Sequence, residues 1–299
     1  MYELIIIGAG PAGITAGVYA ARQKIKTLVL TKDIGGQAAW SGNIENYTGY
    51  QFISGPELTR KFEEHLNKFD IKLHTPEEVI SAAKNKSAIT VKTNRGEYSS
   101  KTLIISSGKS PRLLNIPGEK EFKNKGVTYC AVCDGPIFAG KDVAVIGGGN
   151  SALDAVNQMT KIARKVYLIN ANPSLSGEAI LREKIEKAGN VEVINNAATR
   201  EIRGDTFVRA IKIEAGGQPR VIPVEGVFVE IGLIPASKFI DIVEKNQWGE
   251  IRVDTRCATN IPGIFAAGDV TDVPEKQIIV AAGEGSKAAL SVARYLSEN

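Results

Sequence analysis

The chain has 299 residues, of which 43% are hydrophobic and 23% are charged, and its formal net charge at neutral pH is +4. This composition excludes a disordered protein, and the length favours two domains over one. The charge is small for this length, and no block of Lys and Arg alternates with aromatic residues, so we expect no nucleic-acid partner.

The first thirty residues predict a strand, a helix and a second strand. Leu4–Ile7 is apolar and ends at a glycine, small residues at helical spacing follow from Ala12 to Arg22, and Thr27–Leu30 is apolar again. Continuously apolar strands are typical of a parallel sheet that is buried on both faces. The uncharged stretch from Leu4 to Ala21 contains four glycines and a proline. We therefore expect neither a membrane span nor a leader peptide there.

The same order of elements returns in the middle of the chain. Val143–Ile146 is an apolar run that leads into a second glycine motif, a helix is predicted from Ser151 to Ala163, and Val166–Ile169 is apolar again. Between the two copies, Glu57–Phe69 has the pattern of an amphipathic helix. This repetition predicts two nucleotide-binding domains of similar build.

The last forty residues predict a strand at Gly263–Asp269 and a helix over Gln277–Leu296 with a glycine-broken start. These elements have no sheet of their own, so the simplest place for them is the first domain. We therefore expect an α/β protein with two Rossmann-like, three-layer domains, the second inserted into the first. Residues 1–112 and 246–299 would form the first nucleotide-binding domain, and residues 113–245 the second.

The turn after the first strand has the pattern Gly-x-Gly-x-x-Gly. Its candidate cofactor-binding residues are Gly8, Gly10, Pro11, Ala12 and Gly13. Such a motif lets the backbone approach a pyrophosphate and presents a helix N-terminus to its charge. A tight turn without a ligand is the alternative, and the position between a strand and a helix argues against it. About 20 residues on, where an acid for the ribose is usual, the chain has Thr31, which weakens the sugar contact but leaves the phosphate site.

The second glycine motif predicts a nicotinamide nucleotide site. Its candidate residues are Gly147, Gly149, Asn150, Ser151 and Ala152, with Asn170 at the position of the ribose-binding residue. Neither an acid for a free 2′-hydroxyl nor an arginine for a 2′-phosphate follows the next strand. Arg164 and Lys165 precede that strand, at the wrong end to reach the adenosine ribose. A 2′-phosphate would find little positive charge, so we expect NADH as the donor in preference to NADPH.

Cys130 and Cys133 are separated by two residues and followed by Asp134, a spacing typical of a redox dithiol. A structural zinc site is an alternative, but the chain offers only Cys257 and two scattered histidines as further ligands, so we expect no metal. Inert buried cysteines would leave Asp134 unexplained, whereas its carboxyl group suits proton exchange with a thiol. Three cysteines do not make a secreted disulfide framework, so the cytoplasm is expected. Cys257 has no neighbouring cysteine and is interpreted as a small apolar core residue.

With these motifs in view, the chain resembles the low-molecular-weight thioredoxin reductases over essentially its whole length. It resembles the flavoprotein portion of alkyl hydroperoxide reductase still more. The resemblance rests on the first glycine motif, the dithiol, and the segments Gly35–Gln37, Ile44–Tyr47, Gly268–Asp269 and Lys276–Gly285. It implies FAD in the first domain, with the three motif glycines at the pyrophosphate, Asp269 on the ribityl chain and Gln277 near the isoalloxazine ring. The cofactor residues implied beyond the first motif are Gly36, Gln37, Asn46, Gly268, Asp269, Gln277 and Ile278.

The resemblance also implies a role for each residue of the dithiol segment. Cys133 would face the flavin, Cys130 would attack the disulfide of a partner, and Asp134 would donate or accept the proton. Nicotinamide and dithiol cannot both contact the flavin at once, so the domains are expected to rotate between two states. A homodimer is implied as well.

Two departures from the family pattern matter. The histidine-arginine-arginine cluster of NADPH-dependent thioredoxin reductases does not follow Ile169, and the first strand begins at Glu3 without a thioredoxin-like extension. We therefore expect an enzyme that passes electrons from NADH through FAD and the Cys130–Cys133 dithiol to a separate thioredoxin- or glutaredoxin-like protein. Two alternatives remain open. One is the same enzyme with reduced ferredoxin as its donor, and the other is a non-catalytic redox sensor, which predicts negligible turnover.

Overall fold

The computed structural model describes residues 1–41, 43–44, 46–85 and 88–299. The chain forms two compact units: unit 1 comprises Met1–Ser110 and Ile234–Asn299, and unit 2 comprises Pro111–Leu233. Unit 2 is thus inserted into unit 1. The two connecting segments, β9 (Lys109–Pro111) and β18 (Leu233–Pro235), pair as a short two-stranded sheet.

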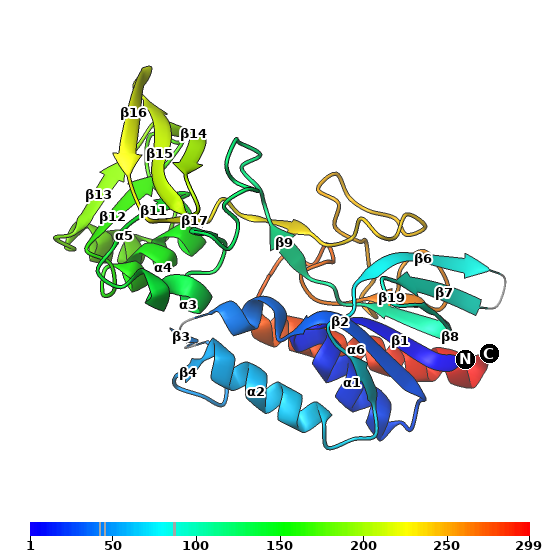
Figure 1. The fold of residues 1–299 in the computed structure, drawn as a ribbon. Helices are drawn as coiled ribbons and strands as arrows, with labels where there is room; N and C mark the ends of the chain where they lie inside the picture. Colours follow the sequence, from blue (N-terminus) through cyan, green and yellow to red (C-terminus); the bar gives the residue numbers. More distant parts are fainter. Residues whose placement is uncertain (42, 45, 86–87) are drawn as a thin grey trace. The chain divides into compact units, whose positions relative to one another are not determined.

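Unit 1 is built on a parallel sheet in the order β5, β2, β1, β8 and β19 (Figure 1). These strands are β1 (Tyr2–Ala9), β2 (Thr27–Ile34), β5 (Lys72–His74), β8 (Glu97–Ile105) and β19 (Ile264–Ala266). The helices of this unit are α1 (Pro11–Arg22), α2 (Gly55–Leu66) and α6 (Ile278–Glu298), with a 3-10 turn η1 (Gly36–Trp40) and a small ribbon of β3 (Asn43–Ile44) and β4 (Ile53–Ser54). The apolar runs of β1 and β2 are buried, which explains why these strands do not alternate.

One face of this sheet is covered by α1 and α6, which pack tightly against each other. A Cβ atom on Gly285 would lie 2.0 Å from the carbonyl oxygen of Ala12, so glycine at this position of α6 allows the close approach of the two helices. The expectation of a glycine-broken start for this helix is wrong, because α6 is continuous from Ile278. Glycine here serves packing between helices and does not interrupt the helix.

The same sheet continues from β8 into the antiparallel strands β7 (Ala88–Thr93) and β6 (Val79–Asn85). Buried residues of β6, β7 and a segment that follows the second connection form one core with the other face of the parallel strands. Ile240, Val243 and Ile251 of that segment are buried in the same core as β1 and β2. The return to unit 1 therefore lies at Ile234, earlier in the chain than the boundary of 246 that the sequence suggests.

Unit 2 has a parallel sheet in the order β10, β17, β11, β12 and β13 (Figure 1). These strands are β10 (Val127–Thr128), β11 (Asp142–Ile146), β12 (Lys165–Ile169), β13 (Val191–Ile194) and β17 (Gly226–Val229). One core joins this sheet to α3 (Ala131–Asp134), η2 (Gly135–Phe138), α4 (Asn150–Met159) and α5 (Ala179–Glu186). The opposite face packs on an antiparallel sheet of β14 (Ala197–Gly204), β15 (Val208–Ala215) and β16 (Gln218–Pro223).

No helix in the described part of the chain combines the length and the apolar character that crossing a bilayer requires. The longest helix, α6, contains polar and charged residues along its length.

Candidate active site

The first glycine turn contains glycines of two kinds. A Cβ atom on Gly8 would lie 2.4 Å from the carbonyl oxygen of Ser106, and one on Gly13 would lie 1.9 Å from the carbonyl oxygen of Gly8. The backbone leaves no space for a side chain at either position, so both residues must be glycine. Gly10 differs: it is the N-cap of α1 with φ −76°, and the nearest atom to its Cβ would be the carbonyl oxygen of Gly35 at 3.8 Å. The open space above this helix N-terminus suits a pyrophosphate.

Thr31 stands at the end of β2, where an acid for the ribose is usual. Its hydroxyl oxygen accepts a hydrogen bond from the Ala9 amide at 3.1 Å, and the hydroxyl donates to the carbonyl oxygen of Asp33. Thr31 is also buried. Its side chain thus holds the strand ends together and leaves no hydroxyl hydrogen for a sugar.

Several of the implied flavin residues lie close together in unit 1. A Cβ atom on Gly36 would lie 3.7 Å from the Cα atom of Gly10, and the Asn46 amide donates to the side-chain oxygen of Gln277 at 3.1 Å. The residues implied beside these are Gln37 in η1, Pro11 and Ala12 in the first turn of α1, and Ile278 at the start of α6. Glu45, within the Ile44–Tyr47 segment, lies outside the described residues.

Gly268 follows β19 and connects it to the N-terminal part of α6. Its amide donates to the carboxylate of Glu284 at 2.8 Å, and Glu284 is only 4% exposed. Burial raises the pKa of Glu284, and the hydrogen bond from Gly268 opposes that rise. Glu284 was missed from the sequence, although an acid among the small residues of a helix that packs on α1 is a recognisable signal.

Asp269 follows Gly268 and is partly buried. It forms no side-chain hydrogen bond with any residue that the structure describes, and burial raises its pKa, which Lys276 and Lys109 oppose. Lys276 and Lys109 each form an ion pair with the Glu250 carboxylate, at N–O distances of 3.3 and 3.2 Å respectively. A carboxyl group without a partner here suits the hydroxyl groups of a sugar or ribityl chain.

The second glycine turn repeats the geometry of the first. Gly149 is the N-cap of α4 with φ −93°, and the nearest atom to its Cβ would be the Ser176 hydroxyl at 3.9 Å. Gly147 has φ +144°, and its Cβ would lie 2.2 Å from the carbonyl oxygen of Glu230. Ala152 is fully buried against the sheet. As in unit 1, the glycine at the helix N-cap, here Gly149, is the one with free space at the position of a Cβ atom.

Asn150 and Ser151 form the first turn of α4. The Asn150 side chain accepts from the Glu178 amide at 2.8 Å and donates to the Glu178 carboxylate at 3.2 Å. Asn150 therefore ties the helix start to the segment before α5, and Ser151 is exposed beside it.

Asn170, the expected ribose residue, is a structural residue of the turn after β12. Its amide donates to the carbonyl oxygen of Asn172 at 3.0 Å and to the Asn195 side chain at 2.8 Å, and its side-chain oxygen accepts from the Asn172 amide at 3.2 Å. Asn170 is 1% exposed, and a Cβ atom on Gly148 would lie 2.4 Å from its side-chain oxygen. Both amide hydrogens are thus engaged within the chain.

The dithiol segment begins where β10 ends. Cys130 is disulfide-bonded, whereas the side chain of Cys133 lies outside the described part of the structure. The Thr128 hydroxyl donates to the Asp134 carboxylate and accepts from the Cys130 amide at 3.2 Å. Thr128 therefore links the acid to the cysteine backbone, a role that was missed from the sequence. Ala131 of the same segment packs in one core with α4, so the dithiol segment and the second glycine turn belong to one layer of unit 2.

The model of the pyridine nucleotide-disulphide oxidoreductase family matches residues 2–285. The chain belongs to this family. It is 40% identical over 301 residues to an NADH dehydrogenase of Bacillus subtilis and 41% identical over 302 residues to a subunit of the alkyl hydroperoxide reductase of Staphylococcus epidermidis. Each alignment covers 100% of this chain but only 59% and 60% of those relatives. The crystal structure of Lactococcus lactis thioredoxin reductase matches with a TM-score of 0.92 and 34% identity over 100% of both chains.

These matches confirm the predicted fold class of two Rossmann-type domains and the predicted resemblance to the low-molecular-weight thioredoxin reductases. A pyridine nucleotide-disulphide oxidoreductase uses a flavin and a nicotinamide cofactor, and both open glycine turns described above suit a dinucleotide. The chain thus has the two nucleotide-binding domains of the pyridine nucleotide-disulphide oxidoreductase family.

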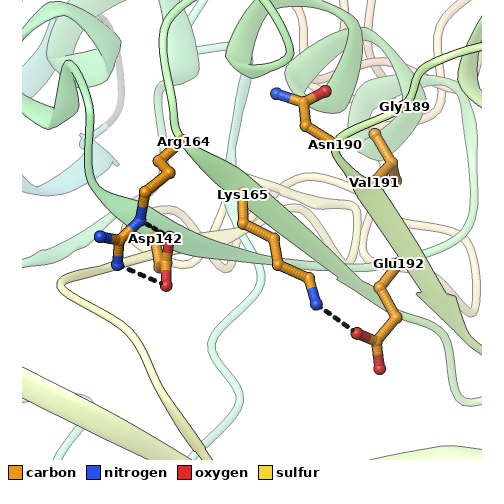
Figure 2. A pocket seen from close by; sticks show the side chains of 7 residues that line it. All are labelled: Asp142, Arg164, Lys165, Gly189, Asn190, Val191 and Glu192. Carbon is orange, nitrogen blue, oxygen red and sulfur yellow. Dashed lines mark hydrogen bonds and ion pairs between the residues drawn. The ribbon is translucent and has the colours of Figure 1, made fainter.

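The chain also has a shallow depression of about 630 Å³ in unit 2, at the starts of β11, β12 and β13 (Figure 2). Arg164 binds Asp142 at 2.8 Å, and Lys165 binds Glu192 at 2.7 Å (Figure 2). Both cations are therefore paired with acids and lie at the opposite edge of the sheet from the second glycine turn, as the sequence indicates. They are not available to a nucleotide bound at that turn.

Proposed function

We propose that the protein is an NADH-dependent flavoenzyme that reduces its own Cys130–Cys133 disulfide and then the disulfide of a thioredoxin- or glutaredoxin-like protein. Unit 1 would bind FAD and unit 2 would bind NADH. The observation that supports this assignment most is the pair of open glycine caps, one in each unit, with the dithiol segment in the same layer as the second. The proposal includes a cytoplasmic homodimer, and light scattering on the purified protein tests the oligomeric state.

The residues of unit 1 have distinct roles in this proposal. FAD, when bound, supplies two-electron transfer between the nicotinamide and the sulfur chemistry. Gly10 lets the pyrophosphate approach the N-terminus of α1. Asp269 would accept hydrogen bonds from the ribityl hydroxyls, and Asn46 and Gln277, which are hydrogen-bonded to each other, would hold the isoalloxazine ring.

The dithiol performs two exchange steps. Its disulfide takes up two electrons and two protons and becomes two thiols. The Cys130 thiolate then attacks one sulfur of the acceptor disulfide, and Cys133 displaces the acceptor from the mixed disulfide, which restores the ring and releases a reduced acceptor. Asp134, held by the Thr128 hydroxyl, exchanges the proton of the sulfur that forms or leaves.

The turn after β12 supports NADH as the donor. Ala171 and Asn172 are exposed there, and no Lys or Arg occurs between Lys165 and Arg182. A 2′-phosphate at this turn would therefore lack a cation, whereas a free 2′-hydroxyl needs none.

Introducing arginines at this turn is expected to admit NADPH. In the double variant Ala171→Arg and Asn172→Arg, kcat/KM for NADPH should rise by about 10- to 100-fold, because each charge-assisted hydrogen bond to phosphate contributes about 1.5–3 kcal/mol. The wild-type protein should prefer NADH. The matched control is Lys165→Gln at the opposite edge of the sheet, which should leave the ratio of the two donors unchanged. A wild-type protein that prefers NADPH would contradict the proposal.

The donor and the catalytic nature of the protein are tested together by rapid mixing. Oxidised protein with FAD bound is mixed with NADH, NADPH or reduced ferredoxin while the flavin absorbance is followed. We expect rapid bleaching with NADH, followed by turnover when a thioredoxin-fold disulfide protein is added. Bleaching by ferredoxin alone would favour the ferredoxin-dependent enzyme, and bleaching by NADH without turnover on any thioredoxin-fold protein would favour the redox sensor.

A further inference from the structure

Glu230 lies at the carboxyl end of β17, next to the second glycine turn. Its amide donates to the carbonyl oxygen of Ile146 at 2.8 Å, and its own carbonyl oxygen lies where a Cβ atom on Gly147 would need space. The sheet order places β17 and β12 on opposite sides of β11. A dinucleotide that lies across this switch point places its adenosine over β12 and its nicotinamide over β17. Glu230 is therefore on the nicotinamide side.

The side chain of Glu230 is on the α4 face of the sheet. Phe228 packs with α4 in one core, whereas Val227 and Val229 pack with the antiparallel sheet in the other. Side chains of a strand alternate between its two faces, so the side chain of Glu230 lies on the same face as that of Phe228. It thus lies on the same face as the helix whose N-terminus would receive the pyrophosphate.

The carboxyl group of Glu230 has no partner that would keep it ionised. Among the described residues it forms no side-chain hydrogen bond and no ion pair. Partial burial, and then the negative charge of Asp154 in α4, raise its pKa to about 8. The pKa of Asp154 is itself raised by partial desolvation and by Glu178, and Lys184 of α5 opposes this. On the β10 side the next acid is Asp134, which the Thr128 hydroxyl binds.

We propose that Glu230 is a positioning residue for the nicotinamide: its protonated carboxyl group donates a hydrogen bond to the carboxamide oxygen of the bound ring. This inference rests on the proposed function and extends it, because it makes nucleotide affinity depend on a proton. An ionised carboxylate has no hydrogen to donate to the carboxamide oxygen. Deprotonation therefore removes this contact.

The nucleotide binds the form of the protein in which Glu230 is protonated. Its affinity is therefore highest below the pKa of Glu230 and falls as the pH rises through that pKa. With a pKa of about 8, roughly nine tenths of the protein is protonated at pH 7 and one tenth at pH 9. We expect NADH, whose nicotinamide ring is uncharged, to bind about tenfold more weakly at pH 9 than at pH 7.

Anaerobic calorimetric titration of the FAD-loaded protein with NADH at pH 7 and pH 9 tests this inference, after the flavin has been reduced with dithionite so that it takes up no hydride. Glu230→Gln keeps a hydrogen-bond donor and should bind NADH with nearly the same affinity at both pH values. Glu225→Gln, at an exposed position at the other end of the same strand, should keep the wild-type loss. ADP-ribose, which lacks the nicotinamide, should bind equally at both pH values. Binding of ADP-ribose by each variant verifies that unit 2 is folded.

Two results would overturn the inference, and they differ from failure of the proposed function. If the wild type binds NADH equally at pH 7 and pH 9, or if Glu230→Gln shows the same loss as the wild type, Glu230 does not position the ring. If neither NADH nor ADP-ribose binds at either pH, unit 2 is not a nicotinamide nucleotide site and the proposed function fails with it.

Discussion

Replacing Cys133 by Ser is expected to lower disulfide reductase turnover by at least about a thousandfold while NADH still bleaches the flavin. A single remaining sulfur cannot close the ring, so the electrons have no acceptor beyond the flavin, and a mixed disulfide cannot be resolved. Cys130→Ser should lose turnover to the same extent, because no thiolate is left to attack the acceptor. Turnover is measured with NADH and a thioredoxin-fold disulfide protein, and flavin reduction is measured by rapid mixing.

The matched control is Cys257→Ser. Cys257 is 1% exposed, its thiol contacts the carbonyl oxygen of Glu284 at 3.6 Å, and burial raises its pKa to about 11. A thiol that stays protonated and enclosed is a poor nucleophile, so this variant should keep turnover within about twofold of the wild type. Equal losses in Cys257→Ser and Cys133→Ser would contradict the assignment of the dithiol.

The second large effect is expected from the two open glycine caps. Gly10→Ala should abolish FAD retention, and Gly149→Ala should keep the yellow cofactor but weaken NAD⁺ binding by about 100-fold. Both glycines have negative φ and open space around the added methyl group, so the chain itself tolerates alanine. Only a pyrophosphate bound close to the backbone would clash with the added methyl group.

Gly13→Ala serves as the contrasting variant for this pair. Its methyl group would lie 1.9 Å from the carbonyl oxygen of Gly8, so the fold itself should be destabilised, as thermal unfolding of the apoprotein would show. Apoprotein melting temperatures of Gly10→Ala and Gly149→Ala should stay close to the wild type. If Gly10→Ala retains FAD while Gly149→Ala loses it, FAD binds to unit 2 and the nicotinamide nucleotide to unit 1, which is the reverse of the proposal.

The fold was predictable where local pattern and long-range packing agree. The apolar runs of β1, β2, β11 and β12 are buried on both faces, and each glycine motif joins a strand to a helix. The prediction was wrong for the start of α6, because Gly285 reads locally as a helix breaker and only its contact with Ala12 gives it a packing role. The strands β6, β7 and β14–β16 pair with their neighbours in sequence, but the cores that they cover contain residues distant in sequence, so no local pattern assigns these strands to that place.

Spacing in the chain identifies the glycines and cysteines as candidate site residues. It does not identify Thr128, Glu284 or Glu230, whose surroundings are set by residues on other elements. The position of Asn170 after β12 predicts a ribose contact, whereas both of its amide hydrogens donate to groups within the chain. Position in a motif predicts which residues are near a ligand, but only the three-dimensional contacts show which polar groups are free.

The central claim is that the flavin passes two reducing equivalents to the disulfide of the same chain. An anaerobic titration with dithionite tests it most directly, with flavin absorbance and free thiols measured at each addition. We expect the wild type to take up about four electrons per chain, with about two new thiols, whereas Cys130→Ser takes up about two electrons, all on the flavin. Full reduction of the wild-type flavin at two electrons per chain, with no new thiol, would contradict it.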